Sequence, residues 1–190
     1  MKRGVRAVGI AESYTGEEST LCAAVTTTDG VVDGFAFGRC TVGGMDATTA
    51  IRELYARLDR EDIRYIFVSG VALAWYNIVQ LRTLAADLDR PVLALSYEAS
   101  DGLADAIREA FDESEGAIRL ARFRVLPARR PVELDGGDIY VRAVGLEDES
   151  PESIVRAYTR AGLRPEPVRV ARLAARAADE YRTATESESL

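Results

Sequence analysis

The sequence predicts an α/β domain built on a mixed sheet, in which three antiparallel strands precede parallel βαβ units and helices cover both faces. Two observations lead to this prediction. Three apolar stretches open the chain with only turn residues between them, so they pair as antiparallel neighbours. Short strand patterns then alternate with amphipathic helix patterns, and strands that are joined through helices lie parallel.

The first three strands are predicted as an antiparallel meander. A polar loop that contains Gly16 separates the first two, and Asp29-Gly30 is a strong two-residue hairpin signal between the second and third. With the turn at that position, Cys22 faces Phe37 and not Cys40, so we expect two free structural thiols. The expected segments are a strand at 5–10, a loop at 11–19, and strands at 20–28 and 31–42.

The middle of the chain alternates helices with buried strands. Gly43-Gly44 ends the third strand, and Asp46, Asn77 and Ser100 each stand where a helix N-cap belongs. Apolar residues follow each of them at helical spacing. The expected elements are a helix with its apolar stripe from Ile51 to Leu58, a strand at 65–68, a helix with its stripe from Ile78 to Leu88, a strand at 92–95, and a helix with its stripe from Leu103 to Phe111.

The last third begins with a stretch at 117–132 whose pattern is less regular, followed by an alternating strand at 138–144. Ser150-Pro151-Glu152 combines a cap, a proline and a first-turn acid, so it predicts a helix start, and Gly162 is the expected end. Pro165-Glu166-Pro167 opens a last helix to about Arg182. We expect residues 1–182 to form a single domain and 183–190 to form a disordered polar tail.

The composition is acidic and almost free of lysine. The chain has 31 acidic and 24 basic residues, Lys2 is the only lysine, and the net charge is −7. Carboxylates stay hydrated when salt competes for water, and strong salt screens their mutual repulsion. This composition is typical of proteins in cells that hold high salt. The alternative is an ordinary acidic protein from a GC-rich genome, which also favours arginine.

The absence of histidine excludes several kinds of site. It removes Ser-His-Asp and Cys-His catalysis and histidine metal sites, and two cysteines alone do not make a zinc site. No glycine-rich loop follows the first strand, so a Rossmann or P-loop nucleotide site is not expected. No apolar run reaches about 20 residues and the N-terminus lacks a signal-peptide pattern, so we expect a cytoplasmic protein.

Two acidic residues stand where a carboxylate could serve a site. Glu12 follows the first strand, and Asp46 begins the first helix, where it can cap the helix and still offer an oxygen to a metal or a water. The ordinary alternatives are a solvated glutamate and a plain N-cap.

Arginines gather in two places. Five of them share residues 117–132 with no acid between, and Arg169, Arg172 and Arg176 share one face of the last helix. The planar guanidinium suits phosphate because it forms bidentate hydrogen bonds. The alternatives are pairing with flanking acids and a solvated helix face. The arginines of the first group are Arg119, Arg122, Arg124, Arg129 and Arg130.

Five segments follow one another along most of the chain: VRAVGIAES (5–13), TVGGMDAT (41–48), SGVALAWYNIVQL (69–81), YVRAVGLE (140–147) and RPEPVRVARLAA (164–175). In this order they resemble the archaeal endonuclease dU family, which is related to endonuclease V. The resemblance implies an RNase H-like fold and cleavage of DNA near deoxyuridine in DNA repair, with Mg²⁺ or Mn²⁺ as the cofactor and DNA as the partner. The arginines named above would then hold the DNA.

The resemblance also implies a site that this chain keeps only in part. Glu12 and Asp46 would be the catalytic and metal-binding acids, joined by Asp138 or Glu147. Ala11 stands where the family carries a metal-binding aspartate, Ser69 stands where related nucleases carry an acid, Gly43 replaces a further acid, and Arg172 replaces a histidine. These departures leave an alternative open, namely a relative that binds nucleic acid or a partner protein without cutting.

The composition predicts that the protein requires salt to fold. We expect circular dichroism to show loss of structure when the protein is moved from molar KCl into dilute buffer, because unscreened carboxylates then repel one another. A protein that stays fully folded in dilute buffer would exclude the high-salt interpretation.

Overall fold

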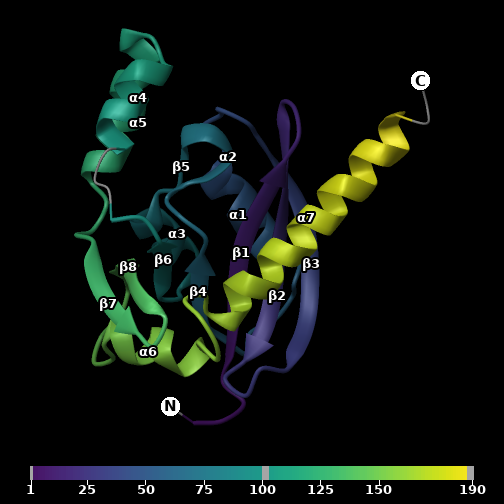
Figure 1. Cartoon of the computed structure of the whole chain (residues 1–190), viewed down its shortest axis with the longest axis vertical. Helices are drawn as coiled ribbons and strands as arrows, with labels where there is room; N and C mark the ends of the chain where they lie inside the picture. The colour runs from purple at the N-terminus through teal and green to yellow at the C-terminus, as the bar shows by residue number, and fades with distance from the viewer. Residues whose placement is uncertain (1, 100–102, 188–190) are drawn as a thin grey trace.

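The structure, a computed structural model, describes residues 2–99 and 103–187. They form one seven-stranded mixed sheet in the order β3-β2-β1-β4-β6-β8-β7, with helices on both faces (Figure 1). The predicted fold class is confirmed. Within these residues, no helix is both long enough and apolar enough to cross a membrane.

The first three strands form the predicted antiparallel meander. The Asp29-Gly30 turn is present, and the Gly30 N–H donates to the Thr27 carbonyl at 2.9 Å. Cys22 lies opposite Phe37, as predicted, and both cysteines are free. The loop expected at 11–19 is mostly strand, because both strands continue into it. The strands are β1 (Arg6–Tyr14), β2 (Glu18–Thr27) and β3 (Val32–Thr41).

The parallel part of the sheet carries helices on one face. Strand β4 (Ile63–Val68) lies parallel to β1, and β6 (Val92–Ser96) lies parallel to β4. Helices α1 (Ala47–Ala56) and α3 (Leu81–Leu88) pack against one face of these strands through a core of fully buried aliphatic side chains. Between them lie the short α2 (Leu73–Tyr76) and β5 (Asn77–Ile78).

An antiparallel hairpin completes the sheet beyond β6. Strand β8 (Gly137–Val144) pairs antiparallel with β6, and β7 (Arg130–Leu134) forms the edge. Helix α6 (Pro151–Tyr158) begins as predicted, with the Ser150 hydroxyl oxygen accepting from the Ser153 N–H at 3.1 Å. It ends before the predicted Gly162, and Thr159 is its C-cap.

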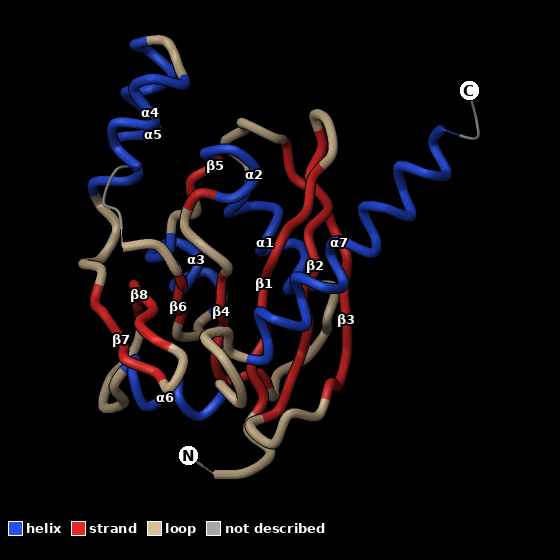
Figure 2. Tube along the Cα trace, viewed as in Figure 1, coloured by secondary structure: helices blue, strands red, loops and turns tan. Residues whose placement is uncertain are grey.

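Regular structure occupies most of the segment at 117–132, which the sequence pattern predicts to be less regular. Helix α5 (Glu113–Arg124) occupies much of it and packs with α4 (Leu103–Ala110) into an arm that stands away from the sheet (Figures 1 and 2). Helix α5 has few buried residues and no strong apolar stripe, so its sequence lacks the usual helix signal. The predicted cap Ser100 lies outside the described residues.

Helix α7 (Glu166–Ser187) crosses the opposite face of β1 and β2 (Figure 1). Its start touches the backbone of the central strand, because a Cβ at Gly9 would lie 2.1 Å from the Pro167 carbonyl carbon. Only glycine permits this approach. The helix continues beyond the predicted Arg182 to Ser187, so residues 183–187 are helical and not the expected tail, and 188–190 lie outside the described residues.

Both edge strands are protected against pairing with a further strand. On β3, the Phe37 carbonyl accepts from Arg57 and the Asp33 carbonyl accepts from Arg60, each at 2.7 Å. On β7, Pro131 lacks a backbone N–H. Fewer backbone groups are therefore open on either edge.

Asp179 fastens α7 to the hairpin of β1 and β2. This carboxylate is 2% exposed and accepts hydrogen bonds from Thr20 at 3.0 Å, Thr15 at 3.1 Å and Arg182 at 2.9 Å. Burial acts to raise the pKa of Asp179, but the hydrogen bonds from Arg182, Thr20 and Thr15 outweigh it and hold the pKa below its ordinary value.

We expect Asp179→Ala to lower the free energy of unfolding by about 3 kcal/mol, because it leaves the partners of a buried charge unpaired. Because the pKa of Asp179 is lower in the folded protein than in the unfolded chain, its contribution to the free energy of unfolding is fully present above the unfolded-state pKa. That contribution is lost as pH falls through the folded-state pKa. Asp179→Asn should therefore weaken the acid sensitivity of stability below about pH 4. Denaturant melts at several pH values, with the exposed-pair variant Asp87→Ala as control, test this; equal losses in both variants would contradict it.

Candidate functional site

Asp46 holds the end of β3 against the start of α1. Its carboxylate accepts from the Asn77 Nδ2 at 2.6 Å and from the Thr41 hydroxyl at 2.9 Å, and it also accepts from the Thr41 N–H. Burial acts to raise the pKa of Asp46, but these hydrogen bonds hold it below its ordinary value. Asp46 occupies the N-cap position without capping, because both its oxygens face other donors.

Asn77 caps a different helix from the one predicted. Its Oδ1 accepts from the Ala47 N–H at 2.9 Å, so it satisfies a free donor at the start of α1. The helix that follows Asn77 in sequence begins only at Leu81, and Gln80 is its N-cap. Asn77 is fully buried and joins its own turn to the distant segment 41–47, at the end of β3 and the start of α1.

Glu12 lies inside β1, opposite Leu21, and its Oε2 accepts from the Ser19 hydroxyl at 3.0 Å. Burial raises the pKa of Cys40 to about 12, and the negative charges of Asp46 and Glu12 add to this. The two predicted acids therefore both lie near Cys40, at the end of the meander.

Asp138 does not join these two acids. It lies at the start of β8, opposite Glu133, and β8 is the third strand from β1, about 14 Å away at the usual strand spacing. In the described ranges, no three acidic or cysteine side chains are close enough together to hold a metal ion. Since the oxygens of Asp46 are also engaged, these residues do not fit a two-metal centre.

The position of Ala11 has no space for a metal-binding side chain. Ala11 is 1% exposed and packs with Ala24 and Ala171 between β1, β2 and α7. A carboxylate there would require room that the helix now fills.

A cavity of about 670 Å³ lies at the carboxyl ends of β4 and β6. Ser69 follows β4 at its wall, and its N–H donates to the Ile10 carbonyl at 2.9 Å, which places the cavity beside the end of β1. The carboxyl ends of parallel strands are the usual place for ligands in such sheets. Four arginines line the cavity: Arg129, Arg142, Arg164 and Arg172.

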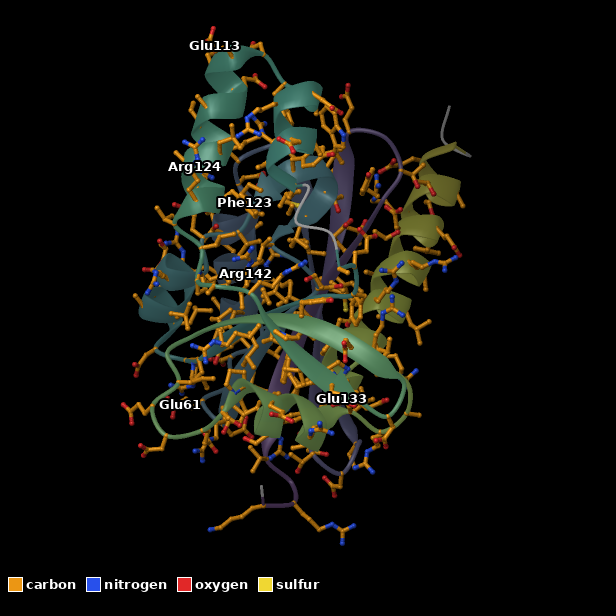
Figure 3. The ribbon with its side chains drawn as sticks, turned by 60° about the vertical axis from the view of Figure 1, so that its left-hand side comes forward. Glu61, Glu113, Phe123, Arg124, Glu133 and Arg142 are labelled. Carbon is orange, nitrogen blue, oxygen red and sulfur yellow. The ribbon has the colours of Figure 1, made fainter. Side chains whose placement is uncertain are left out.

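Aromatic rings and backbone carbonyls fix the orientation of these arginines. The Arg129 guanidinium lies 4.2 Å from the Tyr140 ring centre and donates to the Glu98 carbonyl at 3.0 Å. The Arg142 guanidinium lies 5.4 Å from the Phe123 ring centre, and Figure 3 shows Arg142 below Phe123.

Tyr97 and Arg164 bring unpartnered donors to the same cavity. The Arg164 guanidinium lies 4.5 Å from the Tyr97 ring centre. In the part of the chain that the structure describes, the Tyr97 hydroxyl and the Arg164 Nε are buried without a hydrogen-bond partner. Burial raises the pKa of Tyr97 to about 12, although Arg164 and Arg172 act to lower it. The hydroxyl is therefore a neutral donor, and the cavity favours an anion.

The arginines predicted to hold nucleic acid separate into three groups. Arg129 and Arg172 line the cavity. Arg119, which is 4% exposed, and Arg122 donate to the Gly43 and Met45 carbonyls, and Arg169 pairs with Glu166 at 2.8 Å. Arg124 and Arg130 are exposed and do not line the cavity.

The sequence prediction missed Tyr97, Arg142 and Arg164. Tyr97 stands just after the end of a predicted strand, where functional residues are common. Its position could therefore have identified it as a candidate. Arg142 lies on β8, whose neighbour in the sheet was not predictable from its own sequence. Arg164 lies just before the start of the last helix.

The family model described as endonuclease dU matches residues 3–179. A UPF0215 protein of Pyrobaculum calidifontis is 31% identical over 178 residues, which cover 92% of this chain and 97% of the relative. A UPF0215 protein of Archaeoglobus fulgidus is 30% identical and covers 90% of this chain and 92% of its own.

Solved structures agree with this family. The crystal structure of a protein of unknown function from Archaeoglobus fulgidus matches with a TM-score of 0.79 and 28% identity, and covers 91% of this chain and 97% of its own. Ciona intestinalis endonuclease V, solved with an inosine-containing DNA, matches with a TM-score of 0.61 and 12% identity over 95% of this chain and 87% of its own. The second likeness shows the shared RNase H-like fold. The chain belongs to the endonuclease dU family, a family of nucleases.

Proposed function

We propose that this protein is an endonuclease that acts on DNA containing deaminated bases, deoxyuridine in particular, in DNA repair. The observation that supports this proposal most is the arginine-lined cavity at the carboxyl ends of β4 and β6. Four guanidinium groups line this one cavity in a chain whose net charge is −7. A DNA backbone is a polyanion that such a cavity would hold.

The groups in the cavity suit a phosphate of the DNA backbone. Guanidinium groups form bidentate hydrogen bonds with phosphate oxygens, and the Tyr97 hydroxyl adds a neutral donor. Neither Arg164 nor Arg172 forms an ion pair with a described acid, so both are available to a ligand. The arginines orient the DNA strand, and neighbouring groups would carry out its hydrolysis.

Glu12 is the best remaining candidate for the catalytic carboxylate. It lies near the end of β1, which adjoins the cavity through Ser69, and only Ser19 donates to its side chain in the described structure. If Mg²⁺ or Mn²⁺ acts as a cofactor, Glu12 would be its first ligand. Asp46 would have to lose its hydrogen bond from Asn77 or from Thr41 before it could bind the same ion.

The second candidate function is binding without cleavage. It is favoured by the packing of Ala11 under α7, by Ser69 at the end of β4, and by Arg172 at the cavity wall. Cations stand where carboxylates would be needed to concentrate metal ions. Such a protein would hold a DNA strand and leave it intact.

We expect the protein to nick a uracil-containing duplex, and not a matched thymine duplex, when Mn²⁺ is added at a salt concentration that keeps it folded. Glu12→Ala should abolish nicking and Asp46→Ala should reduce it, because the first removes the candidate catalytic group and the second loosens the turn beside it. Asp87→Ala is the control at an exposed acid away from the site. If the folded protein binds the duplex without nicking it, the second candidate function is correct.

We expect Arg164→Ala and Arg172→Ala each to weaken DNA binding about tenfold and to reduce the dependence of affinity on salt by about one counterion. Arg156→Ala is the matched control, since Arg156 pairs with Glu152 on α6 and does not line the cavity. Fluorescence anisotropy of labelled DNA, titrated at several KCl concentrations, measures both quantities. Equal affinity in all three variants would show that the cavity does not hold the DNA backbone.

A further inference from the structure

Three consecutive residues before Asn77 have a backbone conformation that side chains normally avoid. The φ angles of Ala74, Trp75 and Tyr76 are 41°, 59° and 61°, and none of the three is glycine. The left-handed region is disfavoured for residues with a Cβ, and bulky ones least often adopt it. Such conformations persist only where the surrounding structure enforces them, and they are common at ligand sites.

The surroundings of this turn do enforce it. The chain on either side forms antiparallel bridges, Leu73 with Asn77 and Ala72 with Ile78. The Ala74 carbonyl accepts from the Gly43 N–H at 2.7 Å. The buried Asn77 then fixes the far end of the turn to α1.

The enforced turn presents an aromatic side chain to solvent. Leu73 and Ala74 are buried, but Trp75 is 46% exposed. Its ring centre lies 4.9 Å from that of Phe111 and 5.9 Å from that of Tyr76. A Cβ at Gly43 would lie 2.7 Å from the indole, so Gly43 supports the ring from one side.

The aromatic cluster is stiff as well as exposed. Phe111 lies against the guanidinium of Arg119, 3.7 Å from its ring centre, and Arg119 donates to the Gly43 carbonyl. Phe111 and Tyr76 meet edge to face at 5.8 Å. A rigid, partly exposed indole loses little conformational entropy when a flat ligand stacks on it.

Tyr76 joins this cluster to the arginine-lined cavity. The same tyrosine contacts Trp75 and Phe111 and also lines the cavity with Arg164 and Arg172. A positively charged groove beside stacking aromatic side chains is the combination that holds single-stranded nucleic acid.

We propose that Trp75 is a stacking platform for an unpaired nucleobase of a DNA strand whose backbone lies in the arginine-lined cavity. The proposal rests on the proposed function, since it requires DNA in that cavity. A base inside an intact duplex has no free face, so the platform selects single-stranded or locally opened DNA. Stacking is tolerant of sequence because every base has a flat face.

The chain contains a single tryptophan, so its intrinsic tryptophan fluorescence reports Trp75 alone. We expect a single-stranded oligodeoxynucleotide of uracil and thymine to quench this fluorescence, and a fully paired duplex of the same length to quench it much less. Anisotropy of the same two DNAs, labelled, measures binding independently. Both titrations use the lowest KCl concentration at which circular dichroism shows a folded protein.

Substitutions separate stacking from folding. Trp75→Ala should weaken single-strand binding about tenfold, whereas Trp75→Phe, which keeps an aromatic face, should recover most of it. Tyr181→Ala is the matched control, since Tyr181 is 76% exposed on α7 and does not line the cavity. It should leave affinity and quenching unchanged.

The outcomes distinguish the two proposals. Single-strand binding without quenching, or equal affinity in Trp75→Ala and wild type, overturns the stacking platform and leaves the proposed function standing. No anisotropy change with either DNA overturns the proposed function and the platform together. Equal quenching by duplex and single strand contradicts the preference for an unpaired base.

Discussion

The close contact between Gly9 and Pro167 sets the position of α7 on the sheet. Because β1 has no side chain at Gly9, the start of the helix reaches the backbone of the central strand. From that point the helix direction places Asp179 over the hairpin of β1 and β2. Arg164, just before the helix, and Arg172, two turns into it, thereby reach the cavity. A larger residue at position 9 would displace both the hydrogen bonds of Asp179 and the two arginines of the cavity.

Local signals predicted local structure, and long-range contacts explain most of what was missed. Asp29-Gly30 predicted the hairpin and thereby the pairing of Cys22 with Phe37, because turn chemistry acts within a few residues. Asn77 caps α1 and not the helix that was predicted to follow it, because its partner Ala47 lies 30 residues earlier in the chain. Glu12 and Asp46 both act on the pKa of Cys40, and their place at the strand end and the helix start could be read from the sequence. The arginines of the cavity come from elements whose arrangement only the fold determines.

The site differs in charge from a metal centre built on several carboxylates. Arg172 and Arg164 bring positive charge to the carboxyl ends of the central strands, and alanines close the position where β1 would offer an acid. Such a site attracts an anion more strongly than it attracts a cation. Fold and family alone therefore do not determine activity.

The two protected sheet edges have a consequence for association between copies of the chain. Exposed Phe35 and Phe37 stack at 6.4 Å on β3, and an open edge beside such aromatic residues would invite other chains to pair with it. Arg57 and Arg60 occupy the carbonyls of that edge, and Pro131 interrupts the opposite one. In strong salt, charge repulsion between molecules is screened within a few ångströms and keeps them apart poorly. Direct hydrogen bonds that occupy the edge do not depend on long-range repulsion, so they can keep the chain monodisperse where net charge cannot.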